Sequence, residues 1–157
     1  MPELPELSAH AGRLDRGWAD QELSGFRPLS FTAMKTVSPD PGESVGRHLS
    51  SVTTRGKYLV ADFEGIAFVV HLVQGGRLRG TAPATGAKSP RGALARWRFE
   101  DADDWLLTEA GKEHSAGVWV LDRRDGTSDA EQELFAHLGP DADQLDAVEP
   151  RGNPGVR

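Results

Sequence analysis

The chain has 157 residues, a formal net charge of −6, 38% hydrophobic and 27% charged residues, and no cysteine. This size and composition are typical of one globular domain, and the lack of cysteine excludes disulfides and zinc sites built on thiolates. The first ten residues are acidic where a secretory signal needs a basic start and an apolar run, and no window approaches the roughly 18 apolar residues of a membrane span. We therefore expect a cytoplasmic protein that does not contact a membrane.

The charge is distributed unevenly along the chain. Residues 47–98 contain nine Lys and Arg against two acidic residues, and the remainder of the chain is acidic. A basic segment of this kind is typical of a nucleic-acid-binding face, but it is equally typical of the solvated side of several strands. Charge alone does not decide between these two interpretations.

The first predicted element is a helix that ends near residues 17–20. Leu7, Ala11, Leu14 and Trp18 follow one another at spacings of four, three and four, which places them on one helical face. Pro5 suits a first helical turn, and acidic residues there suit the positive end of the helix dipole. Residues 2 and 3 would then lie immediately before a rigid element.

The middle of the chain is predicted to form strands. Short segments rich in β-branched and aromatic residues alternate with turn residues, which indicates an antiparallel β-sandwich. The predicted strands are Val45–Thr54, Tyr58–Phe63, Ile66–Leu72, Arg77–Thr81, Ala93–Phe99, Trp105–Thr108 and Val118–Leu121. Residues 81–92, rich in small residues and proline, are predicted to form a surface loop.

A second helix is predicted over Asp129–Leu138. Ser128 and Glu131 match a capping box, and Gly139 followed by Pro140 ends the pattern. Residues 146–157 show no periodicity and are expected to be a disordered tail after a domain of residues 1–145. The predicted fold class is therefore mainly β: an antiparallel β-sandwich flanked by two α-helices.

The opening Met1-Pro2-Glu3 is a candidate for nucleophilic chemistry. Initiator methionine is normally removed before a small residue, which leaves Pro2 with a secondary amine whose pKa is about 8, far below that of a lysine. Such an amine forms an iminium with a sugar C1′, and this cation makes the neighbouring carbon acidic enough for β-elimination. A proline after methionine is also a common helix start, so the dipeptide alone is weak evidence.

Several longer motifs resemble one family. The run MPELPEL resembles the opening of the formamidopyrimidine-DNA glycosylase and endonuclease VIII family. RGKYLVADF, HLVQGGRLRG and HLGPDA are similar to further family blocks and occur in the family's order, and LTEAGKEHSAGVWV is similar to a variant in actinobacterial members. The resemblance extends to about residue 145 and implies the N-terminal catalytic domain of a base-excision repair enzyme.

The resemblance implies roles for individual residues. Pro2 would be the Schiff-base nucleophile, Glu3 the neighbouring acid/base, and Lys57 a catalytic and phosphate-binding lysine. Glu6 corresponds to a supporting family acid, although a carboxylate in a first helical turn is equally explained by the helix dipole. The remaining DNA-binding candidates are His71, expected to order the hairpin through hydrogen bonds, Gln74, a filler of the void left by an extruded base or an ordinary turn residue, and Lys88, Arg91 and Lys112.

The sequence also departs from the family. The arginine-phenylalanine pair that enters the duplex is absent from residues 109–115, which read EAGKEHS, and so is a histidine of the basic loop. The helix-two-turn-helix module and the zinc finger of the family's second half are absent too. We therefore expect no cofactor or metal in this chain.

The resulting expectation is a bifunctional DNA glycosylase and AP lyase domain that acts as a monomer on duplex DNA with oxidised or abasic sites. The alternative is a DNA-binding domain that keeps the fold without efficient turnover, and a third is an unstable product. The preferred lesion does not follow from the sequence.

Overall fold

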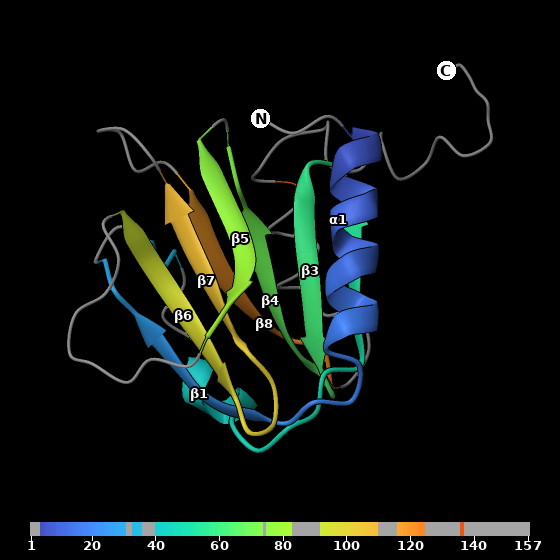
Figure 1. Cartoon of the computed structure of the whole chain (residues 1–157), viewed down its shortest axis with the longest axis vertical. Helices are drawn as coiled ribbons and strands as arrows, with labels where there is room; N and C mark the ends of the chain where they lie inside the picture. The colour runs from blue at the N-terminus through green and yellow to red at the C-terminus, as the bar shows by residue number, and fades with distance from the viewer. Residues whose placement is uncertain are drawn as a thin grey trace.

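In the computed structural model, the described residues are 4–30, 33–35, 40–73, 75–82, 92–109, 116–124 and 136. These residues form two four-stranded antiparallel sheets packed face to face, with a helix along one side (Figure 1). The first sheet has the order β1 (Leu23–Pro28), β6 (Ala93–Phe99), β7 (Asp104–Glu109), β5 (Gly76–Thr81). The second has the order β2 (Ser51–Arg55), β3 (Tyr58–Phe63), β4 (Ile66–His71), β8 (Gly117–Asp122). The predicted sandwich is confirmed.

The core lies between the two sheets and is rich in aromatic side chains. Trp105 of β7 is fully buried, and its ring centroid lies 5.0 Å from that of Phe99 and 6.1 Å from those of Phe63 and Trp97. These ring pairs meet edge to face, an arrangement that adds to the free energy gained from burying their large apolar areas. The two sheets are therefore fixed to each other by side chains that neither sheet could bury alone.

Helix α1 (Leu4–Gly17) covers the gap between the edge strands β2 and β5. Leu7, Ala11 and Leu14 are buried in the core, as their spacing predicted. Asp15 accepts a hydrogen bond from the Val52 amide of β2 at 2.7 Å, and His10 is hydrogen-bonded to the backbone of β5. The helix thus satisfies an edge amide that the sheet leaves unpaired, and it runs antiparallel to β2.

Strand β1 is an element that the sequence prediction missed. Its sequence LSGFRP contains Gly25 and ends at Pro28, two residues that are depleted in strands. The strand is nevertheless stable at the edge of its sheet, where Pro28 has only one neighbouring strand to bond. Phe26 packs against Phe68 and Trp97, with ring centroids 5.0 Å apart in both pairs. Tertiary packing outweighs weak local preference here.

The predicted strand from Val45 to Thr54 is wrong at its start. A short 3-10 helix, η1 (Pro41–Ser44), precedes a turn, and regular pairing begins only at Ser51. Asp40 caps η1, because its Oδ1 accepts a hydrogen bond from the Gly42 amide at 2.8 Å. Val45, which follows η1, is 44% exposed. The β-branched Val45 favoured a strand in the sequence, but its largely exposed side chain gains too little from packing to support one.

The other helical prediction mostly lies outside the described residues. Of the predicted second helix, Ala136 alone is described, and it is helical. The loop at 83–91 and the tail at 146–157 also lie outside. In the part of the chain that the structure describes, no helix has both the length and the apolar character that crossing a bilayer requires.

Candidate functional site

Several strand ends converge at one end of the sandwich, which we call the site end; it lies uppermost in Figure 1. In the second sheet, Tyr58 pairs with His71 and His71 with Gly117, so the start of β3, the end of β4 and the start of β8 form one row. In the first sheet, Gly76 at the start of β5 pairs with Glu109 at the end of β7. Helix α1 begins at this end too, because its last turn contacts the opposite end of β2.

The turn between β2 and β3 presents Lys57 at the site end. Gly56 has φ +57°, a left-handed conformation that glycine adopts at little cost, and it lets the chain reverse between Arg55 and Tyr58, which are paired. Lys57 is exposed to solvent. Its ammonium group is therefore available at the place where the helix begins and β4 ends.

His71 lies beside this turn and is half-buried. Its ring centroid is 4.6 Å from that of Tyr58, and its Nε2 atom is buried without a hydrogen-bond partner among the described residues. Burial lowers the pKa of His71, and the positive charge of Lys57 lowers it further. The imidazole is thus favoured in its neutral form, and its described contact is with an aromatic ring rather than a hydrogen bond at Nε2.

The β4–β5 hairpin is tightly constrained at the same end. Val73 has φ +50°, an uncommon conformation for a β-branched residue. A Cβ atom on Gly76 would collide with the backbone carbonyl of Leu72. The two strands can therefore approach this closely only with glycine at this position.

Glu109 is a residue of the site end for which the sequence predicted no role. Its side chain is 5% exposed, and its Oε1 accepts a hydrogen bond from the Ala116 amide at 2.8 Å. Its own amide donates to the Gly92 carbonyl at 3.0 Å. Glu109 therefore ties together the ends of β7, β6 and β8. An acidic residue ending the apolar strand DWLLTE was the available signal.

A family model for the formamidopyrimidine-DNA glycosylase N-terminal domain matches residues 1–112. The chain belongs to this family. A formamidopyrimidine-DNA glycosylase of Thiobacillus denitrificans is 33% identical over 142 residues, which cover 90% of this chain and 49% of that protein. One from Geobacter metallireducens is 41% identical over 93 residues, or 53% of this chain and 33% of its own length. This chain therefore spans about half the length of the Thiobacillus denitrificans relative.

Solved structures of formamidopyrimidine-DNA glycosylases share the fold. The Lactococcus lactis enzyme, bound non-covalently to DNA containing an AP site, matches with a TM-score of 0.69 at 16% identity over 87% of this chain and 49% of its own. A MutM structure in complex with DNA containing carbocyclic 8-oxo-G matches with a TM-score of 0.71 at 17% identity, over 87% of this chain and 48% of its own. These matches show that the sandwich is that of the glycosylase N-terminal domain.

The structure describes three of the predicted glycosylase site residues. Lys57 and His71 are brought together at the site end, close enough for the charge of one to shift the pKa of the other. Glu6 is exposed in the first turn of α1, a position that fits both of its predicted roles. The other candidates lie outside the described residues: Pro2, Glu3, Gln74, Lys88, Arg91 and Lys112.

Two other kinds of site are relevant to the described residues, a metal site and a surface hollow. Within the described ranges, no three His, Asp or Glu side chains come together as metal ligands would. A surface hollow beside the β6–β7 turn lies at the opposite end of the sandwich and is lined by Arg98 with Glu100, Asp101 and Asp103. The acidic lining of this hollow does not suit a phosphate backbone.

Proposed function

We propose that this domain catalyses excision of damaged bases and cleavage of the resulting abasic sites, with Pro2 as the nucleophile. One observation carries the proposal: α1 begins at the same end of the sandwich as the exposed Lys57 and the neutral-favouring His71. Pro2 precedes Leu4 by two residues, and two residues of chain span at most about 7 Å. The N-terminal amine is thereby tethered to the end where Lys57 lies.

The proposed chemistry begins at C1′ of the damaged nucleotide. The Pro2 nitrogen attacks C1′ and gives up its N–H proton, the glycosidic bond breaks, and the base departs with the bonding electron pair and takes up a proton. The C1′–O4′ bond then opens, with Glu3 as the proposed acid that protonates O4′. The product is an iminium, which needs no proton on nitrogen to carry its positive charge.

The iminium then promotes strand cleavage. Its positive charge accepts electron density from C2′ after a base removes the C2′ proton, and the C3′–O bond breaks as the phosphate leaves. In the proposed arrangement, the Lys57 ammonium binds the phosphate next to the reacting sugar, while a neutral His71 contributes a hydrogen bond to the backbone without adding charge. Base extrusion costs a few kcal/mol, and the β4–β5 hairpin is the proposed element that fills the resulting void.

The test is borohydride trapping on a duplex with one abasic site. The protein is prepared with a cleavable N-terminal extension and assayed before and after the cleavage that exposes Pro2, so both samples share the same folded chain. We expect a covalent protein–DNA adduct only after cleavage. A protein that binds the duplex but yields no adduct with a verified Pro2 terminus would contradict the catalytic proposal and identify a binding domain.

A further inference from the structure

The outer face of the β1–β6–β7–β5 sheet carries a set of arginines that the catalytic proposal does not use. Strand alternation directs them away from the core, since the residues between them are buried among the two sheets. We call this set the arginine face: Arg27, Arg77, Arg79, Arg96 and Arg98.

Register aligns three of these arginines across the sheet. Arg27 of β1 pairs directly with Arg96 of β6, while Arg96 and Arg79 both pair with Leu106 of β7. The three side chains therefore lie in one row that crosses all four strands. Arg77 and Arg98 lie two residues from this row on β5 and β6, a separation of roughly 7 Å along a strand.

The charge of this row is only partly compensated. Asp104 is the one acidic side chain that the described residues of these four strands direct outward, and it bonds to Arg96 at 2.8 Å with both groups buried. Arg96 also donates to the Ala82 carbonyl at 3.1 Å, so it is held in place within the face. Arg27 and Arg79 are exposed to solvent. Arg98 is exposed too, at the margin of the acidic hollow beside the β6–β7 turn, so it is the member of the arginine face nearest to acidic side chains.

An ordinary solvated strand face does not explain this arrangement well. Arg27 stands opposite Arg96, whose charge is compensated by Asp104, so the exposed Arg27 is the uncompensated cation of this pair. All five cations are arginines rather than lysines, and the planar guanidinium binds phosphate through two parallel hydrogen bonds. The outer face of the second sheet differs completely, because Val60, Ala67 and Val69 there form a buried apolar cluster.

We propose that the arginine face is a second binding surface for the phosphate backbone of duplex DNA, separate from the site end. Double-stranded DNA presents one negative charge per about 1.7 Å of its axis, so several exposed guanidinium groups on one sheet face gain contacts without reading the sequence. The chain as a whole is acidic at −6, and attraction to DNA must therefore come from local surfaces such as this one. The inference goes beyond the catalytic proposal and does not depend on Pro2.

The test is the salt dependence of binding to an undamaged duplex, measured by fluorescence anisotropy on the full chain. The variant carries Arg27→Gln, Arg79→Gln and Arg98→Gln, and leaves the buried Arg96–Asp104 pair intact. The matched control carries Arg13→Gln and Arg16→Gln on the exposed side of α1. We expect the triple variant to bind at least tenfold more weakly in low salt, with the slope of log K against log salt reduced by about 2 to 3, and the control to change little.

Three outcomes would overturn the inference. The slope of the triple variant could be unchanged, the α1 control could lose as much binding per charge removed, or polyglutamate could displace the protein as effectively as duplex of equal charge. Thermal melts of both variants show that the fold is kept. Borohydride trapping at saturating protein reports separately on Pro2, so failure of this inference and failure of the catalytic proposal give different results.

Discussion

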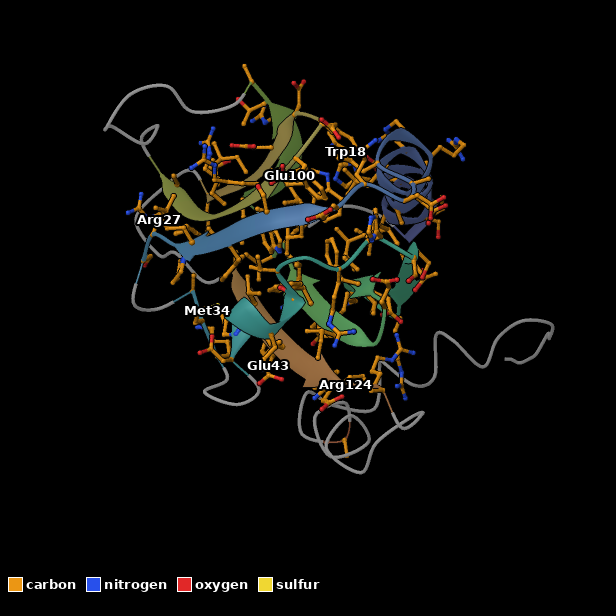
Figure 2. All side chains as sticks on the ribbon, turned by 90° about the horizontal axis from the view of Figure 1, so that it is seen from below. Trp18, Arg27, Met34, Glu43, Glu100 and Arg124 are labelled. Atoms are coloured by element: carbon orange, nitrogen blue, oxygen red, sulfur yellow. The ribbon has the colours of Figure 1, made fainter. Side chains whose placement is uncertain are left out.

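The end of the sandwich opposite the site end carries a group of charged side chains that contact one another, whereas the site end presents the exposed Lys57 beside the half-buried His71. We call the former the ion-pair end and define it by Glu43, Arg47, Glu64, Asp122 and Arg124, of which Figure 2 labels Glu43 and Arg124. There Arg124 contacts Asp122 at 2.6 Å and Glu43 at 3.3 Å, and Arg47 donates to the Glu64 carbonyl at 2.8 Å. These contacts join η1, the β3–β4 turn and the end of β8.

Constrained glycines occur at both ends. Gly56, Gly76 and Gly92 at the site end adopt conformations or approaches that a side chain would oppose, and so do Gly46 and Gly65 at the ion-pair end. Nε2 of His71 is buried with no hydrogen-bond partner among the described residues, and so are the indole nitrogens of Trp97 and Trp105 in the core. The two ends therefore differ in their charged groups: those of the ion-pair end contact one another at the surface, whereas Lys57 at the site end is exposed beside the half-buried His71, which fits the proposed presentation of reactive groups to DNA.

The largest expected effect is that of Gly76→Val. The new side chain would collide with the Leu72 backbone, which cannot move without displacing the β4–β5 turn. We expect a loss of about 3 kcal/mol or more in the free energy of unfolding, measured with urea. Gly25→Ala in β1 is the matched control, because nothing lies within 4 Å of the position that its new Cβ would take, and it should cost under about 1 kcal/mol. Equal losses in both variants would show that the site end is not specially constrained.

Substitution of Lys57 at the same end should change adduct formation on DNA but not the free energy of unfolding. Lys57→Gln removes an exposed ammonium, so we expect a change within about 0.5 kcal/mol in the free energy of unfolding. Adduct formation on abasic DNA should fall at least tenfold, or about 1.4 kcal/mol in activation free energy. Arg16→Gln on α1 should leave the rate unchanged. An unaltered rate in Lys57→Gln would remove this residue from the proposed mechanism.

A smaller effect is expected on the titration of the half-buried His71 and His10. Burial is the larger cause of the lowered pKa of His71 and Lys57 the smaller, so Lys57→Gln should raise that pKa while leaving it below 6.5. His10 is the internal control: its pKa is lowered by burial and by the charge of Arg13, and it should respond to Arg13→Gln instead. NMR titration of the ring protons distinguishes the two, and a His71 shift in Arg13→Gln would contradict the assignment.

The lowered pKa of His71 also makes the free energy of unfolding depend on pH. Because the folded pKa of His71 is depressed, its contribution is fully present above the unfolded value of 6.5 and is lost as pH falls through the folded pKa. His71→Gln should therefore flatten the decline of stability as the pH falls below about 6.5. Urea midpoints measured between pH 7 and pH 5 test this, and an unchanged slope would count against the burial of the ring.

The smallest effect is expected at the ion-pair end. Hydrogen bonds from Arg124 lower the pKa of Asp122 to about 2, so its contribution is present above the usual 3.8 and is lost as pH falls through about 2. Arg124→Gln should return this pKa toward 3.8 and leave DNA binding and adduct formation unchanged. Arg123→Gln, whose described ion pair is with Asp62, is the matched control. Carboxyl NMR titration checks the pKa, and an effect on adduct formation would mean that the two ends are coupled.

The sequence predicted the elements that carry strong periodicity. The 4–3–4 spacing of Leu7, Ala11, Leu14 and Trp18 located α1, and short segments rich in β-branched and aromatic residues between turns located β3 to β8. The sequence did not predict β1, because Gly25 and Pro28 are depleted in strands. This strand is stabilised by Phe26, which packs against Phe68 of one sheet and Trp97 of the other. The prediction failed at Val45 for the opposite reason, since local preference there has no packing to support it.

The candidate site was predicted in its residues but not in its arrangement. Motifs identified Lys57 and His71, but only the register of β3 and β4 shows that they are neighbours. The role of Glu109 depends on the Ala116 amide, seven residues away across two strand ends, which no local pattern specifies. The arginine face likewise requires the pairing of β1 with β6 and of β5 with β7, which are distant in sequence.

The central claim is that the amine of Pro2 forms the bond to the abasic sugar. It is tested most directly by digesting the borohydride-trapped complex with trypsin and locating the sugar remnant by mass spectrometry. We predict the remnant on the peptide of residues 2–13, at its N-terminal nitrogen. A remnant on a lysine instead, including Lys57, or none on protein whose terminus is verified as Pro2, would contradict the claim.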